Sequence, residues 1–456
     1  MGSFARLRWW WMIALLAATL ALAGVVSARA PGNAALAPTA APTLPSPTAT
    51  PSGPPARVTP NILRLPLVYT PARLGAQFGV DFTAWVTIPA IYEGDFPAAR
   101  AMGADWVRVY LPWHVLEPSP GAYDWGQVDP VFAAAHQAGL KPLAVVYGAP
   151  GWASRLPCGP VDDLDAYERF LRAAWGRYGS YTRAWECCNE PDSRGPHWWG
   201  PIIGCWAEYP DLYARQLERF NRTLKSLDPG ALIVLGGLAY DNWVVFERQF
   251  LDSILECGAG PWFDALNLHY YPINAVEFPT LASKIEELRA ILAAHGADKE
   301  QIWVTETSDW VNQDGSLDRQ RDFIVRQFTR GQAAGADVFF WFDASQHPMF
   351  DANLERWLIT RDHQPDNAYF TYQYYARMVG GLECLGAAGD SIEAYHFRGP
   401  GRQVYILWSS DALTRTVRLS VAADALITDR DGALIGYAAP QNGEIAVEVG
   451  PVARYV

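Results

Sequence analysis

The chain has 456 residues, half of them hydrophobic, which is enough for one large domain with a buried core and a smaller second domain. Its formal net charge is −12. This acidic balance argues against a nucleic-acid partner, which requires clustered Lys and Arg side chains.

The first 30 residues have the pattern of an export signal. Arg6 and Arg8 precede an apolar run over residues 9–26, and Ala28-Arg29-Ala30 resembles a small-x-small cleavage site. The apolar run is long for a signal peptide and long enough to span a bilayer. The sequence therefore predicts a protein that is secreted or extracellular, with residues 1–30 acting either as a cleaved signal peptide or as a membrane anchor. Such an anchor is the one membrane contact expected.

Residues 31–58 are rich in Pro, Ala and Thr and carry almost no charge. A segment of this composition cannot bury enough apolar surface to fold and behaves as an extended spacer. We predict a linker between the export signal and a large folded domain over residues 59–381.

Within residues 59–381, short β-rich runs alternate with amphipathic segments, which is typical of a parallel sheet covered by helices. The regular spacing of eight such runs favours an α/β fold of the closed (β/α)8 type, the TIM barrel. The expected strands are Phe78–Phe82, Trp106–Leu111, Leu140–Tyr147, Ala184–Glu190, Leu232–Leu238, Ala265–Tyr270, Ile302–Thr307 and Val338–Phe342.

The helix signals agree with this count. Residues 163–178 space their apolar side chains three and four apart, which predicts a helix leading into the fourth strand. Gly103, Gly139, Gly296 and Gly335 each stand where a helix should end, and glycine readily adopts the left-handed conformation of that position.

Residues 382–456 change to short alternating runs separated by Gly, Pro and Asp, which predicts a small antiparallel β-domain resembling a sandwich. Its expected strands include 403–408, 416–421 and 444–449. Part of residues 57–69 is expected to pair with this domain.

Six cysteines in an exported chain permit disulfides. Cys158 and Cys205 fall in predicted loops and are the favoured pair. Cys187 and Cys188 are adjacent on a strand, where side chains point to opposite faces, so a bond between them is disfavoured. No spacing of Cys and His resembles a zinc site, and we expect neither a metal nor a cofactor.

Two predicted strands end in a glutamate. The fourth ends in Asn189-Glu190-Pro191 and the seventh in Glu306. The active site of a (β/α)8 barrel lies at the carboxyl ends of its strands, and glycoside hydrolysis uses two carboxyl groups that face one bond. The pair predicts this chemistry, although two carboxylates held in structural ion pairs remain an alternative.

The residues then show a family resemblance. Besides the two glutamates, Arg108 lies on the second strand, His269-Tyr270-Tyr271 on the sixth and Trp341 on the eighth. In this order, the set resembles clan A of the glycoside hydrolases, particularly families 39 and 5, over residues 77–380. Leu111-Pro112-Trp113 also resembles the clan's second strand-to-helix segment.

The resemblance implies a retaining double displacement with Glu190 as acid/base and Glu306 as nucleophile. Asn189 would bind the sugar 2-hydroxyl, and Arg108 would keep Glu306 ionised, since a nearby cation favours the carboxylate. The resemblance also implies roles for further residues. Tyr271 or His269 would orient the nucleophile, and Trp341 would form the floor of the sugar site.

Two of these residues have an alternative role: Arg108 could instead pair with Glu186, and His269 could be a core histidine. The sequence also departs from the clan at Cys188, where the clan usually has an aromatic residue.

Aromatic residues are abundant, with 20 Trp and 21 Tyr, and flat rings suit stacking on sugars. We expect Trp113 and Trp152 to contact substrate. Trp198, Trp199 and Trp310 also lie in predicted loops near the strand ends, where packing of the loop is the alternative role.

The sequence thus predicts a retaining glycoside hydrolase acting on O-glycosidic bonds of a polysaccharide or oligosaccharide. A catalytically inactive carbohydrate-binding barrel at the cell envelope is the alternative, and a structural envelope protein is a second one. The presence of both glutamates at their strand ends argues against the inactive barrel, and the aromatic-rich loops argue against the structural envelope protein.

Overall fold

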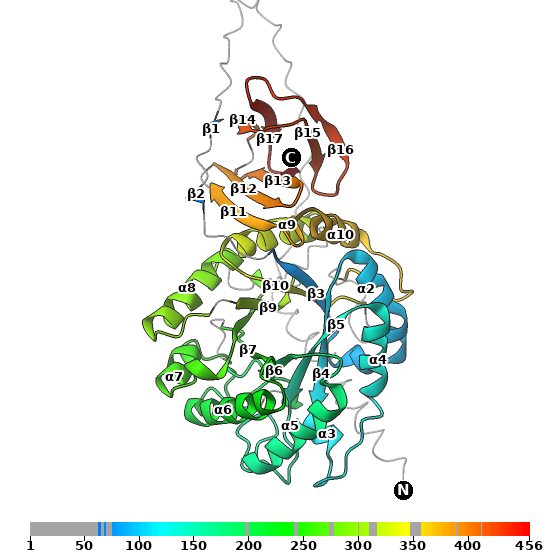
Figure 1. Cartoon of the computed structure of the whole chain (residues 1–456), viewed down its shortest axis with the longest axis vertical. Coiled ribbons are helices and arrows are strands. Elements are labelled where there is room, and N and C mark those ends of the chain that lie inside the picture. Colours follow the sequence, from blue (N-terminus) through cyan, green and yellow to red (C-terminus); the bar gives the residue numbers. More distant parts are fainter. Residues whose placement is uncertain are drawn as a thin grey trace, which may run out of the picture. The chain divides into compact units, whose positions relative to one another are not determined.

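The computed structural model describes residues 63–64, 68–69, 75–196, 200–240, 245–272, 278–299, 301–309, 317–346, 357–388, 391–411 and 413–456. Within them, eight parallel strands close into a barrel in the order β10-β3-β4-β5-β6-β7-β8-β9 (Figure 1). The strands are β3 (Gln77–Asp81), β4 (Trp106–Pro112), β5 (Lys141–Tyr147), β6 (Ala184–Asn189), β7 (Leu232–Gly237), β8 (Ala265–Tyr270), β9 (Gln301–Thr307) and β10 (Val338–Phe342). The predicted (β/α)8 barrel is confirmed, and each strand lies within one or two residues of its predicted position.

Helices alternate with these strands and cover the outside of the barrel (Figure 1). They are α2 (Phe96–Met102), α3 (Trp113–Leu116), α4 (Asp129–Ala138), α5 (Leu164–Tyr178), α6 (Pro210–Leu227), α7 (Phe250–Glu256), α8 (Leu281–Ala294), α9 (Leu317–Ala333) and α10 (Asn367–Val379). Short helical turns occupy Thr83–Thr87, Ile91–Asp95, Gly200–Ile202 and Gly260–Trp262.

The helix ends follow from local chemistry. The carboxylate of Asp163 accepts a hydrogen bond from the Ala166 N–H, so it caps the first turn of α5. Gly103 and Gly139 end α2 and α4 with φ of 102° and 75°, a left-handed conformation that costs glycine little. These features confirm the helix predicted over residues 163–178 and the predicted role of the glycines.

The barrel strands are buried on both faces, as expected for a parallel sheet under helices. One set of side chains fills the barrel interior, including Tyr110, Val145, Val234, Trp303 and Phe340. Residues that alternate with them point outward and join the larger core between sheet and helices. This alternation determines which side chains at the carboxyl ends of the strands face the barrel interior.

The C-terminal region forms antiparallel β-structure, which confirms the prediction for this part of the chain. A seven-stranded sheet has the order β16-β15-β18-β13-β12-β11-β2, and a three-stranded sheet has the order β1-β14-β17, both counted within the described residues. The strands are β11 (Glu383–Ala388), β12 (Ile392–Gly399), β13 (Arg402–Ser409), β14 (Arg415–Ser420), β15 (Ala425–Asp429), β16 (Leu434–Ala438), β17 (Glu444–Val449) and β18 (Arg454–Tyr455). Side chains from both sheets share one small core.

The segment before the barrel supplies two strands to these sheets. β1 (Leu63–Arg64) pairs with β14 in parallel, and β2 (Val68–Tyr69) pairs with β11 in antiparallel orientation. The prediction that part of residues 57–69 pairs with the C-terminal domain is confirmed.

The β-domain is bonded to the helices that end the barrel. Arg330 of α9 donates to Glu393 of β12 with its Nε at 2.9 Å from Oε2. The hydroxyls of Tyr374 and Thr428 lie 2.7 Å apart. Because these contacts hold the β-domain against α9 and α10, it packs with the barrel as one compact unit.

A variant that begins at Thr59 should fold with an unchanged melting temperature, because residues 1–58 have the composition of an export signal and a spacer. A variant that begins at residue 71 should melt several degrees lower, since it loses β1 and β2 from the two sheets. Thermal unfolding followed by circular dichroism measures both. Loss of folding in the first variant, or equal melting of the two, would contradict this boundary.

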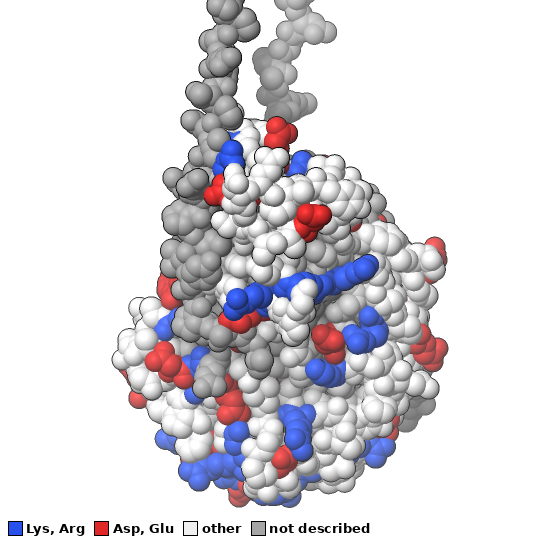
Figure 2. Space-filling view, turned by 45° about the horizontal axis from the view of Figure 1, so that its top comes forward, with Lys and Arg blue, Asp and Glu red and all other residues white. Residues whose placement is uncertain are grey.

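Basic and acidic side chains lie interspersed on the face shown in Figure 2. Several exposed charges of the described residues are paired, such as Arg172 with Glu168 and Arg219 with Asp165. Among the described helices, none is both long and apolar enough to cross a bilayer. The apolar run over residues 9–26 lies outside the described residues.

Candidate active site

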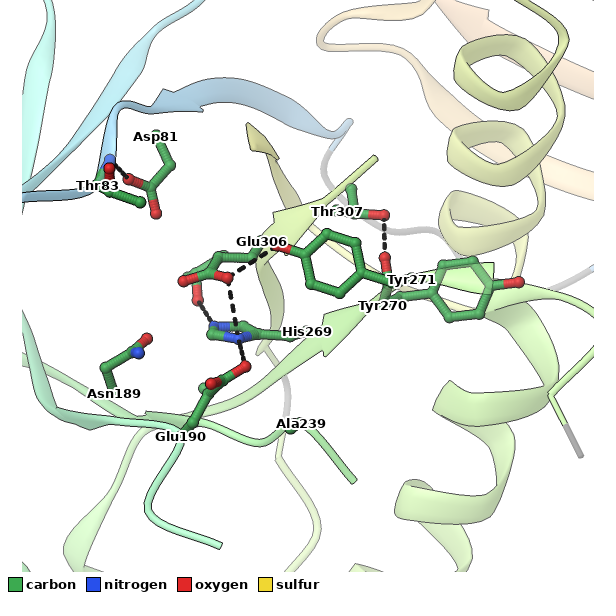
Figure 3. Close-up of polar contacts among 12 residues, drawn as sticks. Asp81, Thr83, Asn189, Glu190, Ala239, His269, Tyr270, Tyr271, Glu306 and Thr307 are labelled. Atoms are coloured by element: carbon green, nitrogen blue, oxygen red, sulfur yellow. Dashed lines mark hydrogen bonds and ion pairs between the residues drawn. The ribbon is translucent and has the colours of Figure 1, made fainter. Parts of the chain in front are cut away.

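Glu190 and Glu306 face each other across the carboxyl end of the barrel, with the imidazole of His269 between them (Figure 3). His269 Nδ1 lies 2.9 Å from Glu190 Oε1 and 3.4 Å from Glu306 Oε2. One carboxylate oxygen of each glutamate and one ring nitrogen of His269 all lie within 4.8 Å of one another. Glu190 follows β6, His269 lies on β8 and Glu306 lies on β9, so the barrel itself holds the two carboxyl groups together.

Each oxygen of Glu306 has a donor. Arg108 Nη1 donates to Oε1 at 2.5 Å, and the Tyr271 hydroxyl donates to Oε2 at 2.8 Å. Burial raises the pKa of Glu306 above its usual value, while Arg108 and Tyr271 act in the opposite direction. The two donors favour the carboxylate form of Glu306, and the contacts of Arg108 and Tyr271 with Glu306 that the sequence predicted are both present.

Arg108 is fully buried at the centre of a carboxylate cluster. Its Nε donates to Glu186 Oε2 at 3.0 Å and its Nη1 to Asp81 Oδ2 at 2.9 Å. The alternative pairing with Glu186 therefore coexists with the contact to Glu306. Burial raises the pKa values of Asp81 and Glu186, and Arg108 lowers them.

Sequence reasoning missed Asp81, which ends β3 and lies at the same end of the barrel. Its Oδ2 also accepts a hydrogen bond from the Tyr110 hydroxyl at 2.9 Å. The signal was available, because Asp81 is a polar residue at the end of a buried strand. Asp81 is fully buried and acts on the site through Arg108.

Asn189 lies beside this cluster at 4% exposure. Its Oδ1 accepts a hydrogen bond from Arg108 Nη2 at 2.7 Å, which orients the amide so that its nitrogen is left to donate elsewhere. This orientation suits the predicted bond to a sugar hydroxyl.

The backbone at the end of β6 has an unusual conformation. Cys188 has φ of 73° and Glu190 has φ of 43°, both in the left-handed region that non-glycine residues seldom adopt. The Cys188 thiol accepts from Gln216 Nε2 of α6 at 3.7 Å. Strained backbone conformations are common at functional sites, where they hold a side chain in a required direction. Here the strained backbone carries Glu190, whose side chain points towards His269.

His269 is 1% exposed and held by its neighbours. Lys284 Nζ donates to the backbone oxygen of His269 at 2.7 Å, and a Cβ at Gly237 would lie 2.1 Å from His269 Nε2. Burial, Arg108 and Lys284 lower the pKa of His269 well below its usual value. The imidazole is therefore neutral and touches both catalytic candidates, so it is more than a core histidine.

The prediction that Trp341 forms the sugar-site floor is wrong. Trp341 is fully buried and packs outward against Phe323 and Phe328 of α9, because β10 alternates and Phe340 takes the inward position. Phe342, which shares the inward face, instead lies beside Tyr271, with ring centroids 5.9 Å apart.

Trp113 also departs from its predicted role. It is 1% exposed, its indole N–H donates to Glu117 Oε2 at 2.7 Å, and its ring packs on Phe170. A ring enclosed in this way offers no face to a sugar. Trp152 packs on Trp113 and remains partly exposed, so its substrate contact stays a prediction.

Trp198, Trp199 and Trp310 lie outside the described residues.

The predicted disulfide between Cys158 and Cys205 is present, with Cα atoms 5.3 Å apart. It joins the loops that follow β5 and β6, and Gly204 N donates to Asn189 O at 2.8 Å. The bridge thus supports the backbone that carries Asn189 and Glu190.

Among the described residues, Glu190, His269 and Glu306 form the one set spaced closely enough to hold a metal ion. Both oxygens of Glu306 are already bonded to Arg108 and Tyr271. Glu306 therefore has no oxygen in this structure that lacks a hydrogen-bond donor.

Comparison with known proteins agrees with this geometry. Residues 211–365 match the family model of the glycosyl hydrolase catalytic core. A family 39 glycoside hydrolase from Bacteroides cellulosilyticus is similar in structure, with a TM-score of 0.66 and 18% identity over 83% of this chain and 80% of that one. A conserved exported protein from Bacteroides fragilis has a TM-score of 0.63 and 13% identity, covering 85% of this chain and 98% of its own.

A family 30 endoxylanase from Clostridium papyrosolvens has a TM-score of 0.59 and 13% identity over 86% of this chain and 98% of that one. No curated protein matched the chain in a sequence search. Families 39 and 30 both belong to clan A of the glycoside hydrolases. The chain therefore resembles clan A, as predicted, and the catalytic-core match supports glycosidase activity.

Proposed function

We propose that the protein is a retaining glycoside hydrolase that cleaves O-glycosidic bonds by double displacement. The observation that carries the proposal is the approach of one carboxylate oxygen of Glu190 to within 4.8 Å of one carboxylate oxygen of Glu306. Retaining enzymes hold their carboxyl groups about 5–5.5 Å apart, whereas inverting enzymes need about 6.5–9.5 Å to admit a water molecule. The short separation favours retention.

Glu306 is the nucleophile in this proposal. Arg108 and Tyr271 hold its carboxylate in one orientation, so it can attack the anomeric carbon and form a glycosyl-enzyme. Glu190 protonates the leaving oxygen in the first step. In the second step its carboxylate takes a proton from the water that attacks the intermediate.

Asn189 is proposed to bind the sugar 2-hydroxyl. Arg108 fixes the amide, so the bond can strengthen as the oxocarbenium-like transition state develops without a cost for reorienting the side chain. The steps use only side chains of this chain, and we propose no cofactor.

The substrate class is proposed as a polysaccharide or its oligosaccharides. The structural neighbours include a protein described as an endoxylanase, and the N-terminal sequence has an export pattern. We propose that the enzyme acts outside the cell, either released or anchored through residues 1–30.

Incubation with a panel of polysaccharides and oligosaccharides should release sugars from at least one substrate. NMR of the first product formed should show the anomer of the substrate, because double displacement inverts the anomeric carbon twice. The opposite anomer would overturn the retaining mechanism. Binding of the panel without any product would instead favour the inactive carbohydrate-binding barrel.

A further inference from the structure

A chain of buried polar groups leads from the backbone of β7 to Glu190. Asn267 Nδ2 donates to Leu235 O at 3.0 Å, and the Thr305 hydroxyl donates to Asn267 Oδ1 at 3.0 Å. His269 Nε2 lies 3.2 Å from Thr305 Oγ1, and its Nδ1 lies 2.9 Å from Glu190 Oε1. Asn267 and Thr305 are fully buried, so they do not touch substrate.

The direction of each hydrogen bond follows from the first one. A backbone carbonyl only accepts, so the amide nitrogen of Asn267 must face Leu235 and its oxygen must face Thr305. The single hydroxyl hydrogen of Thr305 is then committed to Asn267. Towards His269, the Thr305 oxygen can only accept, and this places the imidazole proton on Nε2.

The other imidazole nitrogen is consequently an acceptor. His269 is neutral for the reasons given above, so a proton on Nε2 leaves a lone pair on Nδ1. Gly237 lies against the ring and Lys284 holds the backbone of His269, so the ring is kept in this orientation.

A lone pair on Nδ1 requires a donor on the other side of the 2.9 Å contact. Both oxygens of Glu306 already accept from Arg108 and Tyr271, and its Oε2 lies 3.4 Å from Nδ1, farther away than Glu190 Oε1. The proton between His269 and Glu190 therefore lies on Glu190 Oε1.

We propose that Asn267 and Thr305 are positioning residues that fix the proton of His269 on Nε2 and so hold Glu190 in its protonated form before each turnover. The inference rests on the proposed function, since it assigns Glu190 the role of general acid. It adds two residues that have no direct contact with the reacting atoms.

The arrangement serves both steps of the reaction. In the first, the Oε1–H bond of Glu190 breaks and its proton passes to the glycosidic oxygen as the bond to the anomeric carbon breaks. Glu190 is then a carboxylate facing the Nδ1 lone pair, and repulsion between them makes it a stronger base. In the second, Glu190 recovers its proton from the attacking water, and the starting state is restored.

Other charged and titratable groups face this region, and substitutions at Thr305 leave them in place. They come from the neighbouring strands and from α8: Asp81 of β3, Arg108 and Tyr110 of β4, Glu186 of β6, Tyr271 after β8, Glu306 of β9 and Lys284 of α8.

Neutron diffraction from crystals of the exchanged protein tests the proton positions directly. Deuterium should lie on His269 Nε2 and on Glu190 Oε1, with none on His269 Nδ1. Deuterium on Nδ1 would overturn the proposal. This result does not depend on catalysis, so it separates the proposal from the proposed function.

Thr305→Val tests the consequence for the reaction. Without the Thr305 acceptor, the imidazole proton can move to Nδ1 and donate to the Glu190 carboxylate, which favours the ionised acid. The basic limb of kcat/KM should move down by about one pH unit for a substrate with a poor leaving group. An aryl glycoside with a good leaving group should change less than about threefold, because it needs little protonation.

Two matched variants separate positioning from a loss of packing. Thr305→Ser keeps the hydroxyl and should restore the wild-type basic limb. Thr307→Val removes another buried hydroxyl of β9, which donates to Tyr270 O at 2.7 Å, and should leave the basic limb unchanged. The same shift in Thr307→Val, or an unshifted limb in folded Thr305→Val, would overturn the proposal.

Discussion

Replacing Glu306 by Ala should abolish hydrolysis of every glycoside, with a loss of roughly 10⁴-fold or more in kcat. The side chain lies between Arg108 and Tyr271, and no other described carboxylate occupies the nucleophile's position beside His269. Without it, a glycosyl-enzyme cannot form, so the quality of the leaving group should make no difference. Steady-state kinetics with natural and aryl substrates measure the loss.

Glu190→Ala should behave differently, because it leaves the nucleophile intact. Substrates with poor leaving groups should lose about 10²- to 10⁴-fold, the usual contribution of a general acid. An aryl glycoside with a good leaving group should still glycosylate Glu306, and the intermediate should accumulate since no base activates water. Added azide should restore turnover and give a glycosyl azide of retained configuration.

Mass spectrometry of Glu190→Ala with a good aryl glycoside should therefore show a covalent adduct on Glu306. Equal loss in both variants for all leaving groups, or an azide product of inverted configuration, would mean that the roles or the pair are wrong. The asymmetry is a demanding test, because two structural carboxylates would not produce it.

Much of the fold could be predicted because each strand of a parallel barrel is a short apolar run in the sequence, and an amphipathic helix follows it. The end of each strand also marks the active-site end of the barrel, so Glu190 and Glu306 could be paired although they lie 116 positions apart in the sequence. In the β-domain, the alternation of apolar and polar residues is weaker, so several of its strands were not predicted. In β11, Gly386 and two alanines at its end give little sign of a strand.

Orientation within a strand was harder to predict. The pairing of β10 with β9 shifts register between Phe339 and Trp341, and that of β8 with β9 shifts between Leu268 and His269. Resemblance alone placed Trp341 in the sugar site, whereas alternation along β10 gives that face to Phe340 and Phe342. The contact of His269 with Thr305 depends on the register shift between β8 and β9. The pattern of apolar residues in a sequence does not specify how two parallel strands are aligned.

Arg108→Met should destabilise the protein by about 3–5 kcal/mol, the cost of leaving buried charges without their partner. Arg108 is the cation that contacts Asp81, Glu186 and Glu306, and all four side chains are almost completely buried. As a control, Arg219 also contacts two carboxylates, but its side chain is partly exposed to solvent, at 32%. Arg219→Met should cost less than about 1 kcal/mol.

The cost of Arg108→Met should depend on pH in a defined direction. Arg108 lowers the pKa values of Asp81, Glu186 and Glu306, so its removal raises them further above their unfolded values. A carboxyl group with a raised folded pKa keeps its stability at low pH and loses it as the pH rises through that pKa. Urea unfolding should therefore show a smaller deficit near about pH 5 than near about pH 8. A deficit that is constant over this range, or that grows towards low pH, would show that Arg108 stabilises the barrel by packing and not by neutralising its carboxylates.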